Sequence, residues 1–205
     1  MGFYEARVFP WACDLVLGTR EVAALRTDLL ARARGDVVEI GFGSGLNVPA
    51  YPEGVRRLVA VEPSEGMRRR AASRLAAARF PVELVALAGE RLPLADRTFD
   101  TAATTFTLCS VADPPRVLAE LHRVLRDDGV LLVAEHGRSP RPFMAGLQRA
   151  LTPLNRVVAC GCHLDRPMRQ LVEAAGFRFT SLEDARWSHL PGPFSWLTVG
   201  AARKA

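Results

Sequence analysis

A short segment near the start of the chain places the strongest constraint on the fold. Residues 36–41 are predicted to form a buried strand carried by Val37, Val38 and Ile40, and a turn with glycines at positions 41, 43 and 45 follows at once. Glycine allows positive φ and lets a ligand approach the backbone closely, while the first N–H groups of the next helix are free to meet polar ligand atoms. A strand followed by such a turn is typical of a nucleoside-cofactor site, although a tight turn without a ligand would have the same pattern.

Beyond this turn, segments with strand character alternate with segments of helical periodicity. Further strands are predicted at residues 57–62, 82–87, 98–106, 130–135, 177–182 and 196–202. Helices are predicted at residues 64–79, 114–126 and 166–175, and Gly129 is expected to end the second of them. This alternation predicts an α/β fold whose parallel sheet carries helices on both faces and binds ligands outside the carboxyl ends of its strands.

The length of 205 residues corresponds to a single domain with one core. Helical spacing over residues 5–33, with breaks at Pro10 and Gly18, predicts one or two helices, and we expect residues 1–34 to form an N-terminal lid. Residues 137–164 interrupt the alternation and are too long for a plain connection. We therefore expect them to form a lid or a mobile insert on the substrate side.

Spacing around the glycine-rich turn distinguishes between nucleoside cofactors. The dinucleotide fingerprint needs Gly or Ala three residues after its second glycine, and Leu46 occupies that place. The third glycine is instead Gly45, in the pattern acid-x-Gly-x-Gly-x-Gly. Glu62 ends the second predicted strand, where its carboxylate can accept hydrogen bonds from both hydroxyls of a ribose. An ordinary exposed glutamate at a strand end is the alternative.

Together with this pattern, three further motifs resemble the class I S-adenosylmethionine-dependent methyltransferases, over residues 36–204. They are the run at 89–93 after the third strand, Phe99 with Asp100 at the fourth, and residues 123–129 before the fifth. The resemblance implies a Rossmann-like fold, a seven-stranded and mostly parallel sheet with an antiparallel C-terminal strand. Asp127 and Asp128 stand where a Pro-Gly-Gly ending is usual, which alters the turn and leaves the site unchanged.

The same resemblance implies S-adenosylmethionine as the cofactor and a role for individual residues. Glu39 and Gly41 are expected at its methionine end, Glu62 at the ribose, and Gly89 with Glu90 at the adenine. Many members place an aspartate where Ala88 stands, so we expect backbone groups and Glu90 to compensate. The other expected cofactor-binding residues are Gly43, Gly45, Asn47, Pro63, and, beside the sulfonium, Thr105 and Thr107.

A closer resemblance concerns the acceptor. Residues 107–111, Glu135, His136 and residues 161–164 resemble small methyltransferase-like proteins of animals that methylate alkyl thiols, and their bacterial relatives. This implies a small, apolar acceptor, with a thiol or sulfide first and lipid amines or quinone rings second. A module that binds S-adenosylmethionine without catalysis is the alternative from another class.

Two residues are candidates for catalysis. His136 has a side chain whose ordinary pKa near neutrality suits proton removal, although a structural hydrogen bond is an equal alternative. Cys109 is expected at the mouth of the site, where the alternative is a small packing residue. Three converging cysteines would indicate arsenite as the acceptor, but the spacing does not establish such convergence.

The four cysteines are expected to be free thiols, and no metal site is expected. Cys160, Cys162 and His163 are soft-metal ligand types, but a closed zinc site needs four ligands and usually a wider cysteine spacing. Aromatic residues at both ends of the chain could form an apolar lid, although each one singly is more typical of the core. These are Tyr4, Phe9, Trp11, Trp187 and Trp196.

Composition limits the partners. The isoelectric point near 9.6 reflects arginines, whose only run, at residues 68–70, is typical of a solvated helix face, so we expect a small-molecule substrate and no nucleic acid. No apolar run is long enough for a membrane span, and residues 1–10 lack the pattern of a secretory signal, which favours a cytoplasmic protein. Oligomeric state does not follow from the sequence.

Overall fold

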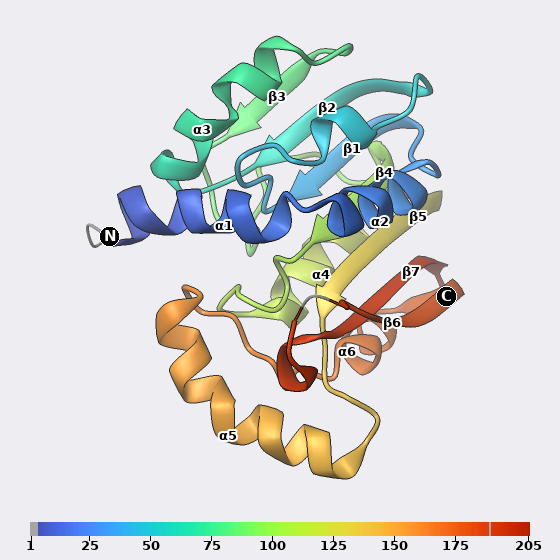
Figure 1. The fold of residues 1–205 in the computed structure, drawn as a ribbon. Coiled ribbons are helices and arrows are strands. Elements are labelled where there is room, and N and C mark those ends of the chain that lie inside the picture. The colour runs from blue at the N-terminus through green and yellow to red at the C-terminus, as the bar shows by residue number, and fades with distance from the viewer. Residues whose placement is uncertain (1–3, 189) are drawn as a thin grey trace.

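A seven-stranded sheet forms the centre of the computed structural model, which describes residues 4–188 and 190–205 (Figure 1). The strand order is β3-β2-β1-β4-β5-β7-β6. Only β7 runs against its neighbours, so the predicted sheet, mostly parallel with one antiparallel C-terminal strand, is confirmed. The strands are β1 (Gly35–Ile40), β2 (Val55–Val61), β3 (Val82–Val85), β4 (Phe99–Thr105), β5 (Leu125–His136), β6 (Phe177–Arg186) and β7 (Trp196–Lys204).

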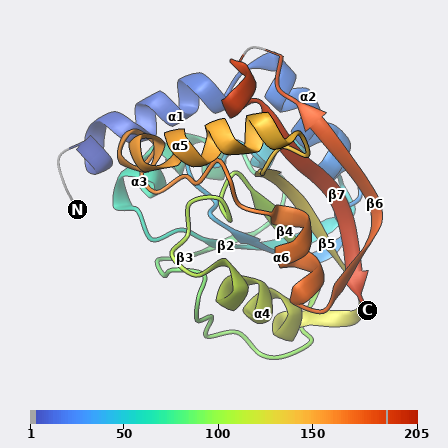
Figure 2. The ribbon, with the colours of Figure 1, turned by 90° about the horizontal axis from the view of Figure 1, so that it is seen from below.

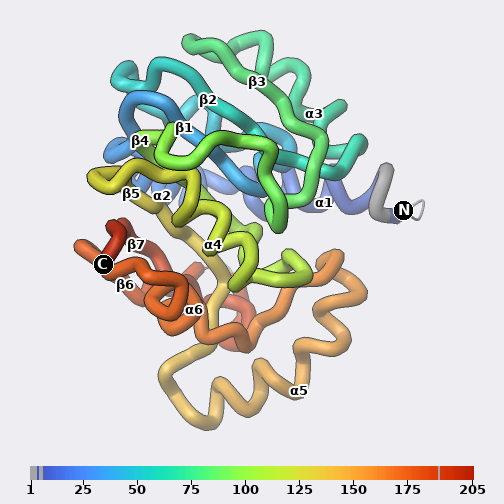
Figure 3. The backbone as a smooth tube through the Cα atoms, turned by 180° about the vertical axis from the view of Figure 1, so that it is seen from behind, coloured from blue at the N-terminus to red at the C-terminus, as the bar shows by residue number. Residues whose placement is uncertain are grey.

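Helices cover both faces of the sheet. Figure 2 shows α2 (Arg20–Leu30) on one side of the strands and α4 (Pro114–Val124) with α6 (Met168–Ala174) on the opposite side. Successive strand residues point to opposite faces, so Val37 packs in the core with α2 and α3 (Glu65–Ala76), whereas Val38 packs with α4 and α6. In Figure 3, seen from behind, α4 and α6 lie in front of the sheet.

The boundary between α4 and β5 differs from the prediction. Asp113 caps α4 by accepting a hydrogen bond from the Arg116 N–H at 3.1 Å, and the apolar face of the helix is buried. The helix does not continue to residue 126 and is not ended by Gly129, because the backbone is already extended at Leu125. Leu125 is fully buried and pairs with Phe99 of β4, so sheet pairing overrides the helical pattern here.

The N-terminal region contains η1 (Tyr4–Val8) and α1 (Phe9–Leu17) before α2. Gly18 separates α1 from α2, as expected. Pro10 does not break a helix, because it lies in the first turn of α1, where the missing N–H has no helical partner to lose. The first three residues of the expected 1–34 segment lie outside the described residues.

The segment 137–164 contains a helix that the sequence pattern did not predict, α5 (Pro142–Val158). Its buried side chains are Gln148 and Thr152, whereas apolar side chains such as Phe143 and Val157 are 83% and 75% exposed. Gln148 holds the helix to the protein by accepting from the Ser139 N–H at 2.8 Å and donating to the Gly137 carbonyl at 3.2 Å. An ordinary surface helix buries its apolar side chains and exposes its polar ones, whereas α5 does the reverse. A search for an apolar helix face therefore missed it.

Two short elements complete the chain, η2 (Val48–Ala50) after the glycine-rich turn and η3 (Gly192–Phe194) before β7. No helix in the described part of the chain has both the length and the apolar character needed to cross a bilayer.

Candidate functional site

A cavity of about 450 Å³ lies at the carboxyl ends of β1, β2 and β4, with α1 and α2 contributing to its wall. The wall contains all but one of the predicted cofactor-binding residues, since Gly45 is not part of it. The predicted residues in the wall are Glu39, Gly41, Gly43, Asn47, Glu62, Pro63, Gly89, Glu90, Thr105 and Thr107. The position of the cavity agrees with the expectation for parallel sheets, where ligands bind outside the carboxyl ends of the strands.

The glycine-rich turn lies against the end of β4. Gly41 has φ +71°, and a Cβ atom there would lie 2.0 Å from the Thr107 Oγ1 atom. A side chain at position 41 would therefore push the β4 end away from the turn. Gly45 also has positive φ, +80°, so its contribution is to the shape of the turn rather than to the cavity wall.

Glu62 follows β2 and is held by the backbone on both sides. Its Oε2 atom accepts a hydrogen bond from the Gly43 N–H at 2.8 Å, and its Oε1 atom accepts one from the Ser64 N–H at 2.8 Å. Burial raises the pKa of Glu62 above its ordinary value, although these two hydrogen bonds act in the opposite direction. Each carboxylate oxygen retains a lone pair for a ligand, which is the geometry that binding of two ribose hydroxyls requires.

Glu39 is the centre of a buried hydrogen-bond network below the turn. Tyr51 donates to it through its hydroxyl at 2.7 Å and Asn47 through Nδ2 at 2.9 Å, and the same Nδ2 atom donates to Thr105 Oγ1 at 2.9 Å. Burial raises the pKa of Glu39 to about 7, despite these hydrogen bonds. The Asn47 Oδ1 atom is buried without a partner among the described residues, so an acceptor is left over for a ligand donor.

The helices α1 and α2 close one side of the cavity through Phe9, Cys13, Leu17 and Arg26. Asp14 attaches α1 to the sheet side, because its carboxylate accepts hydrogen bonds from the hydroxyl of Ser44 in the turn and from the guanidinium groups of α3.

Arg26 is a wall residue that the sequence analysis did not identify. It is 4% exposed, its Nη1 atom donates to the Leu17 carbonyl at 2.6 Å, and its Nε atom has no partner among the described residues. Burial lowers the pKa of Arg26 to about 10, which leaves the group charged at neutral pH. The sequence signal was an arginine on the apolar face that Val22 and Leu29 define.

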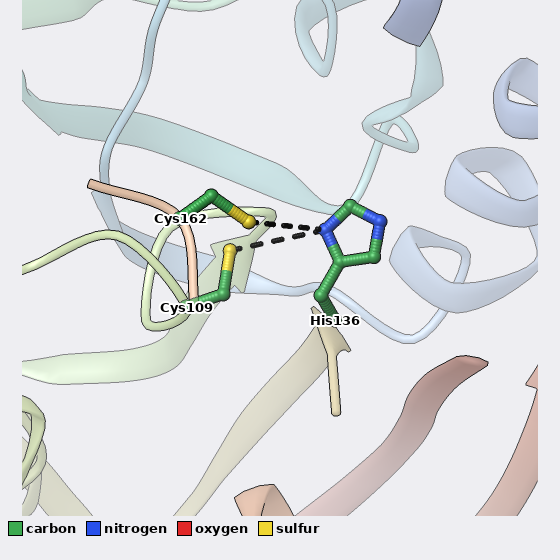
Figure 4. Close-up of side chains that lie close together, drawn as sticks. All are labelled: Cys109, His136 and Cys162. Carbon is green, nitrogen blue, oxygen red and sulfur yellow. Dashed lines mark hydrogen bonds between the residues drawn. The ribbon is translucent and has the colours of Figure 1, made fainter. Parts of the chain in front are cut away.

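Beside the cavity, three separate segments bring Cys109, His136 and Cys162 together (Figure 4). The His136 Nδ1 atom lies 4.0 Å from the Cys109 Sγ atom and 3.7 Å from the Cys162 Sγ atom. The hydrogen bond between the two thiols, with burial, raises the pKa of Cys109, and the same hydrogen bond lowers the pKa of Cys162. We call these three residues the Cys–His cluster.

The predicted catalytic residues Cys109 and His136 lie behind the cavity wall rather than in it. Cys109 adjoins the wall through Ser110, whose Oγ atom is 3.5 Å from its sulfur, and His136 adjoins it through Phe106, with ring centroids 5.4 Å apart. Trp187 stacks on His136 at 6.2 Å. The His136 Nε2 atom is buried without a partner among the described residues.

Glu135, at the end of β5, orients the loop that carries Cys109. Its fully buried carboxylate accepts hydrogen bonds from the Thr104 hydroxyl at 2.6 Å, from the Thr107 N–H at 2.8 Å and from the Cys109 N–H at 3.2 Å. Burial raises the pKa of Glu135, and the hydrogen bonds oppose that effect. From the sequence, Glu135 stands out only through a resemblance, because the fold alone brings its partners together.

The remaining cysteines, His163 and the aromatic residues named from the sequence lie in different parts of the structure. Cys160 is in the cavity wall, and His163 lies 3.8 Å from an Asp165 oxygen, so Cys162 pairs with His136 and not with its sequence neighbours. Cys13, Cys109 and Cys162 carry free thiols, as expected. Among the aromatic residues, Trp187 is buried, but Trp11 is 57% exposed and is not a core residue.

Fold and cavity together define an α/β protein with a nucleoside-cofactor site at the carboxyl edge of a parallel sheet. Residues 38–133 match the family described as methyltransferase domain. The chain is 35% identical to thiol S-methyltransferase TMT1B of Rattus norvegicus over 80% of its own length and 66% of the rat protein. It is 33% identical to TMT1B of Homo sapiens, over 83% of this chain and 70% of the human protein.

The names of other relatives refer to other acceptors. The chain is 32% identical to a phosphatidylethanolamine N-methyltransferase of Cereibacter sphaeroides, over 68% of this chain and 69% of that protein. A solved S-adenosylmethionine-dependent methyltransferase of Thermotoga maritima, titled a possible histamine N-methyltransferase, is 27% identical with a TM-score of 0.69 and 98% coverage of both chains. The chain belongs to the family of S-adenosylmethionine-dependent methyltransferases.

Membership in this family implies S-adenosylmethionine as the cofactor, and the cavity residues fit it. The unpartnered Asn47 Oδ1 atom and the Glu39 carboxylate are acceptors at one end of the cavity, as the amino group of the methionine moiety requires. Glu62 offers two carboxylate oxygens at the end of β2, as ribose hydroxyls require. The polar groups of the cavity thus match the polar groups of the cofactor in type.

Proposed function

We propose that the protein transfers a methyl group from S-adenosylmethionine to a small apolar thiol. The observation that carries this proposal is the set of apolar side chains in the cavity wall. The wall adjoins the Cys–His cluster through Phe106 and Ser110. Its apolar residues include Phe9, Leu17, Phe106, Val111 and Ala112. The name of the TMT1B relatives supports a thiol as the acceptor.

Within this proposal, the residues around the glycine-rich turn hold the cofactor. Glu62 accepts from the ribose hydroxyls, Glu39 and Asn47 accept from the amino group, and the buried Arg26 pairs with the carboxylate of the methionine moiety. Gly89 and Glu90 line the adenine side. The cofactor supplies an electrophilic methyl group on a sulfonium, and the protein aligns it with the nucleophile in a pocket from which water is excluded.

The acceptor side has a separate task, removal of the thiol proton. A thiolate is the nucleophile, and a free thiol with a pKa near 8.5 is only a few per cent ionised at pH 7. Cys109 and His136 adjoin the cavity wall through Ser110 and Phe106, so we assign them to the acceptor.

The test is transfer of radiolabelled methyl from S-adenosylmethionine to a panel of acceptors. We expect turnover of alkyl thiols, and much slower turnover in Glu62→Ala when S-adenosylmethionine is limiting. The panel includes phosphatidylethanolamine and a demethylated menaquinol, since relatives carry those names. If a lipid amine or a quinol is methylated and the thiols are not, that compound class is the acceptor instead of a thiol. Calorimetric binding of S-adenosylmethionine without turnover of any acceptor would favour a non-catalytic binding module.

A further inference from the structure

The Cys–His cluster has the dimensions of a metal site. With Zn–S bonds of about 2.3 Å and Zn–N bonds of about 2.0 Å, tetrahedral angles place ligand sulfur and nitrogen atoms about 3.5 Å apart. The observed distances from the His136 Nδ1 atom to the sulfur atoms of Cys162 and Cys109 are 3.7 and 4.0 Å. All three ligand-type atoms lie within 4.8 Å of one another, so a single ion can reach them with small side-chain movements.

Hydrogen bonds already hold the two cysteine segments together. The His163 N–H donates to the Cys109 carbonyl at 2.7 Å, and Asn155 of α5 donates to the Cys162 carbonyl at 2.8 Å. Glu135 binds the Cys109 N–H from the other side at 3.2 Å. These contacts fix the backbone of both cysteines before any ion binds, which lowers the conformational cost of binding.

A positive group also lies close to the cluster. The Arg166 Nη2 atom donates to the Val111 carbonyl at 2.8 Å, and Nη1 donates to the Leu108 carbonyl, so the guanidinium is fixed on the loop that carries Cys109. Arg166 interacts electrostatically with Cys109 and Cys162. This fixed cation offsets part of the negative charge that two thiolate ligands and the nearby Glu135 carboxylate bring together.

We propose that Cys109, His136 and Cys162 bind one Zn²⁺ ion, whose fourth coordination position beside Ser110 takes the acceptor thiol. Two thiolates and one imidazole leave one position of the zinc tetrahedron open, which is the arrangement of catalytic rather than structural zinc sites. This inference deepens the proposed thiol methylation and rests on it for the identity of the ligand. It differs from the sequence expectation of no metal site, because sequence spacing did not establish that these residues converge.

Zinc would supply the step that a free thiol lacks at neutral pH. On coordination the acceptor loses its S–H proton to solvent, because a thiol on zinc is bound as the thiolate. An electron pair of the coordinated sulfur then forms a bond to the methyl carbon of the donor, and the donor sulfur–methyl bond breaks with its electron pair remaining on the donor sulfur. The neutral thioether product is a weak ligand and leaves the ion.

Metal binding is tested on the reduced full-length protein under anaerobic conditions. We expect one Zn²⁺ per chain by mass spectrometry of the metal, and Co²⁺ substitution giving intense visible bands with a thiolate charge-transfer band. Cys109→Ser and Cys162→Ser should weaken Zn²⁺ affinity at least 100-fold, on the order expected for loss of a ligand. The matched control Cys13→Ser, at a free thiol outside the cluster, should retain it.

Circular dichroism of each variant establishes that the fold is retained, and His136→Gln provides an independent loss of one ligand. Failure of the wild-type protein to bind Zn²⁺ or Co²⁺ stoichiometrically would overturn the inference. Equal loss of affinity in Cys13→Ser would also overturn it. A Cys109–Cys162 disulfide that persists under reducing conditions would also overturn it, and so would binding of arsenite without binding of zinc.

The open position is tested without the methyl donor. Addition of an alkyl thiol to the Co²⁺ protein should shift the charge-transfer band, and an unchanged spectrum would overturn acceptor coordination. A spectrum that responds to thiols with no methylation of them would retain the metal site and refute the proposed function. Methylation at the same rate and pH dependence with and without zinc would retain the proposed function and refute the proposed role of the ion in it.

Discussion

The cavity wall around the glycine-rich turn, which we propose to hold the methyl donor, and the Cys–His cluster beside the cavity, which we propose to serve the acceptor, are built differently. We call them the donor end and the acceptor end. At the donor end, the main groups come from two short stretches, 39–47 and 62–64, and backbone N–H groups from those same stretches hold the Glu62 carboxylate. At the acceptor end, Cys109, His136 and Cys162 come from three segments far apart in the chain. The donor end is thus a local structure that a sequence motif can encode, whereas the acceptor end exists only after the sheet and α5 have assembled.

The largest expected effect is at the acceptor end. Glu135→Ala leaves the buried Thr104 hydroxyl and the buried Cys109 N–H without their acceptor, and each such group costs about 1–3 kcal/mol. We expect the free energy of unfolding to fall by about 3 kcal/mol, measured by urea denaturation. Glu183→Ala, at an exposed position of β6, is the control and should change it by less than about 0.5 kcal/mol. Equal stability of both variants would show that Glu135 does not hold the loop.

At the donor end, Glu62→Ala should weaken S-adenosylmethionine binding about 100-fold. Two hydrogen bonds from ribose hydroxyls to a carboxylate contribute about 1.5 kcal/mol each, and their loss corresponds to that factor. Isothermal titration calorimetry measures the affinity. Glu65→Ala is a matched control, since the Glu65 side chain is 69% exposed and pairs with Arg69 on the helix surface. Unchanged affinity in Glu62→Ala would refute the ribose assignment.

Affinity for the cofactor should also depend on pH through Glu39. Its pKa of about 7 in the free protein must fall on binding if the carboxylate meets a charged amino group, so binding releases a proton. Affinity then rises with pH, by about tenfold between pH 6 and pH 8, because the ionised fraction of Glu39 in the free protein rises by that factor. Titrations in buffers of different ionisation enthalpy measure the released proton. A wild-type protein with flat affinity over this range, or Glu39→Gln with the same slope, would contradict the assignment.

The smallest expected effect concerns α1, which forms part of the cavity wall. Asp14→Asn weakens the contacts to Arg70 and Arg74 but can retain the hydrogen bond from Ser44. Since partly exposed ion pairs contribute up to about 1 kcal/mol, we expect the dissociation rate of S-adenosylmethionine to rise about threefold in stopped-flow measurements. Asp28→Asn, on the neighbouring helix α2 and outside this cavity wall, should leave the rate unchanged. A similar rise in both variants would show that the Asp14 contacts of α1 do not retain the cofactor.

Prediction from the sequence agrees with the structure where the determining interactions are local. The strand at 36–41, the glycines after it and Glu62 led to a set of expected cofactor residues, and all but one of them line the cavity. Their binding of the cofactor stays a prediction. Prediction was wrong at residue 125, where pairing with Phe99 replaces the last helical turn, and it missed α5, whose buried residues are Gln148 and Thr152. In both places, contacts with a distant part of the chain outweigh the local pattern.

The sequence by itself therefore determined the fold class and the donor end, because periodicity and glycine positions act over a few neighbouring residues. Only the tertiary structure decided which cysteines meet. Cys162 lies next to His163 in the chain, yet its sulfur faces His136 of β5 and Cys109 of the loop after β4. Such a meeting depends on how β4, β5 and the turn after α5 pack at one edge of the sheet, and no spacing within the sequence encodes that geometry.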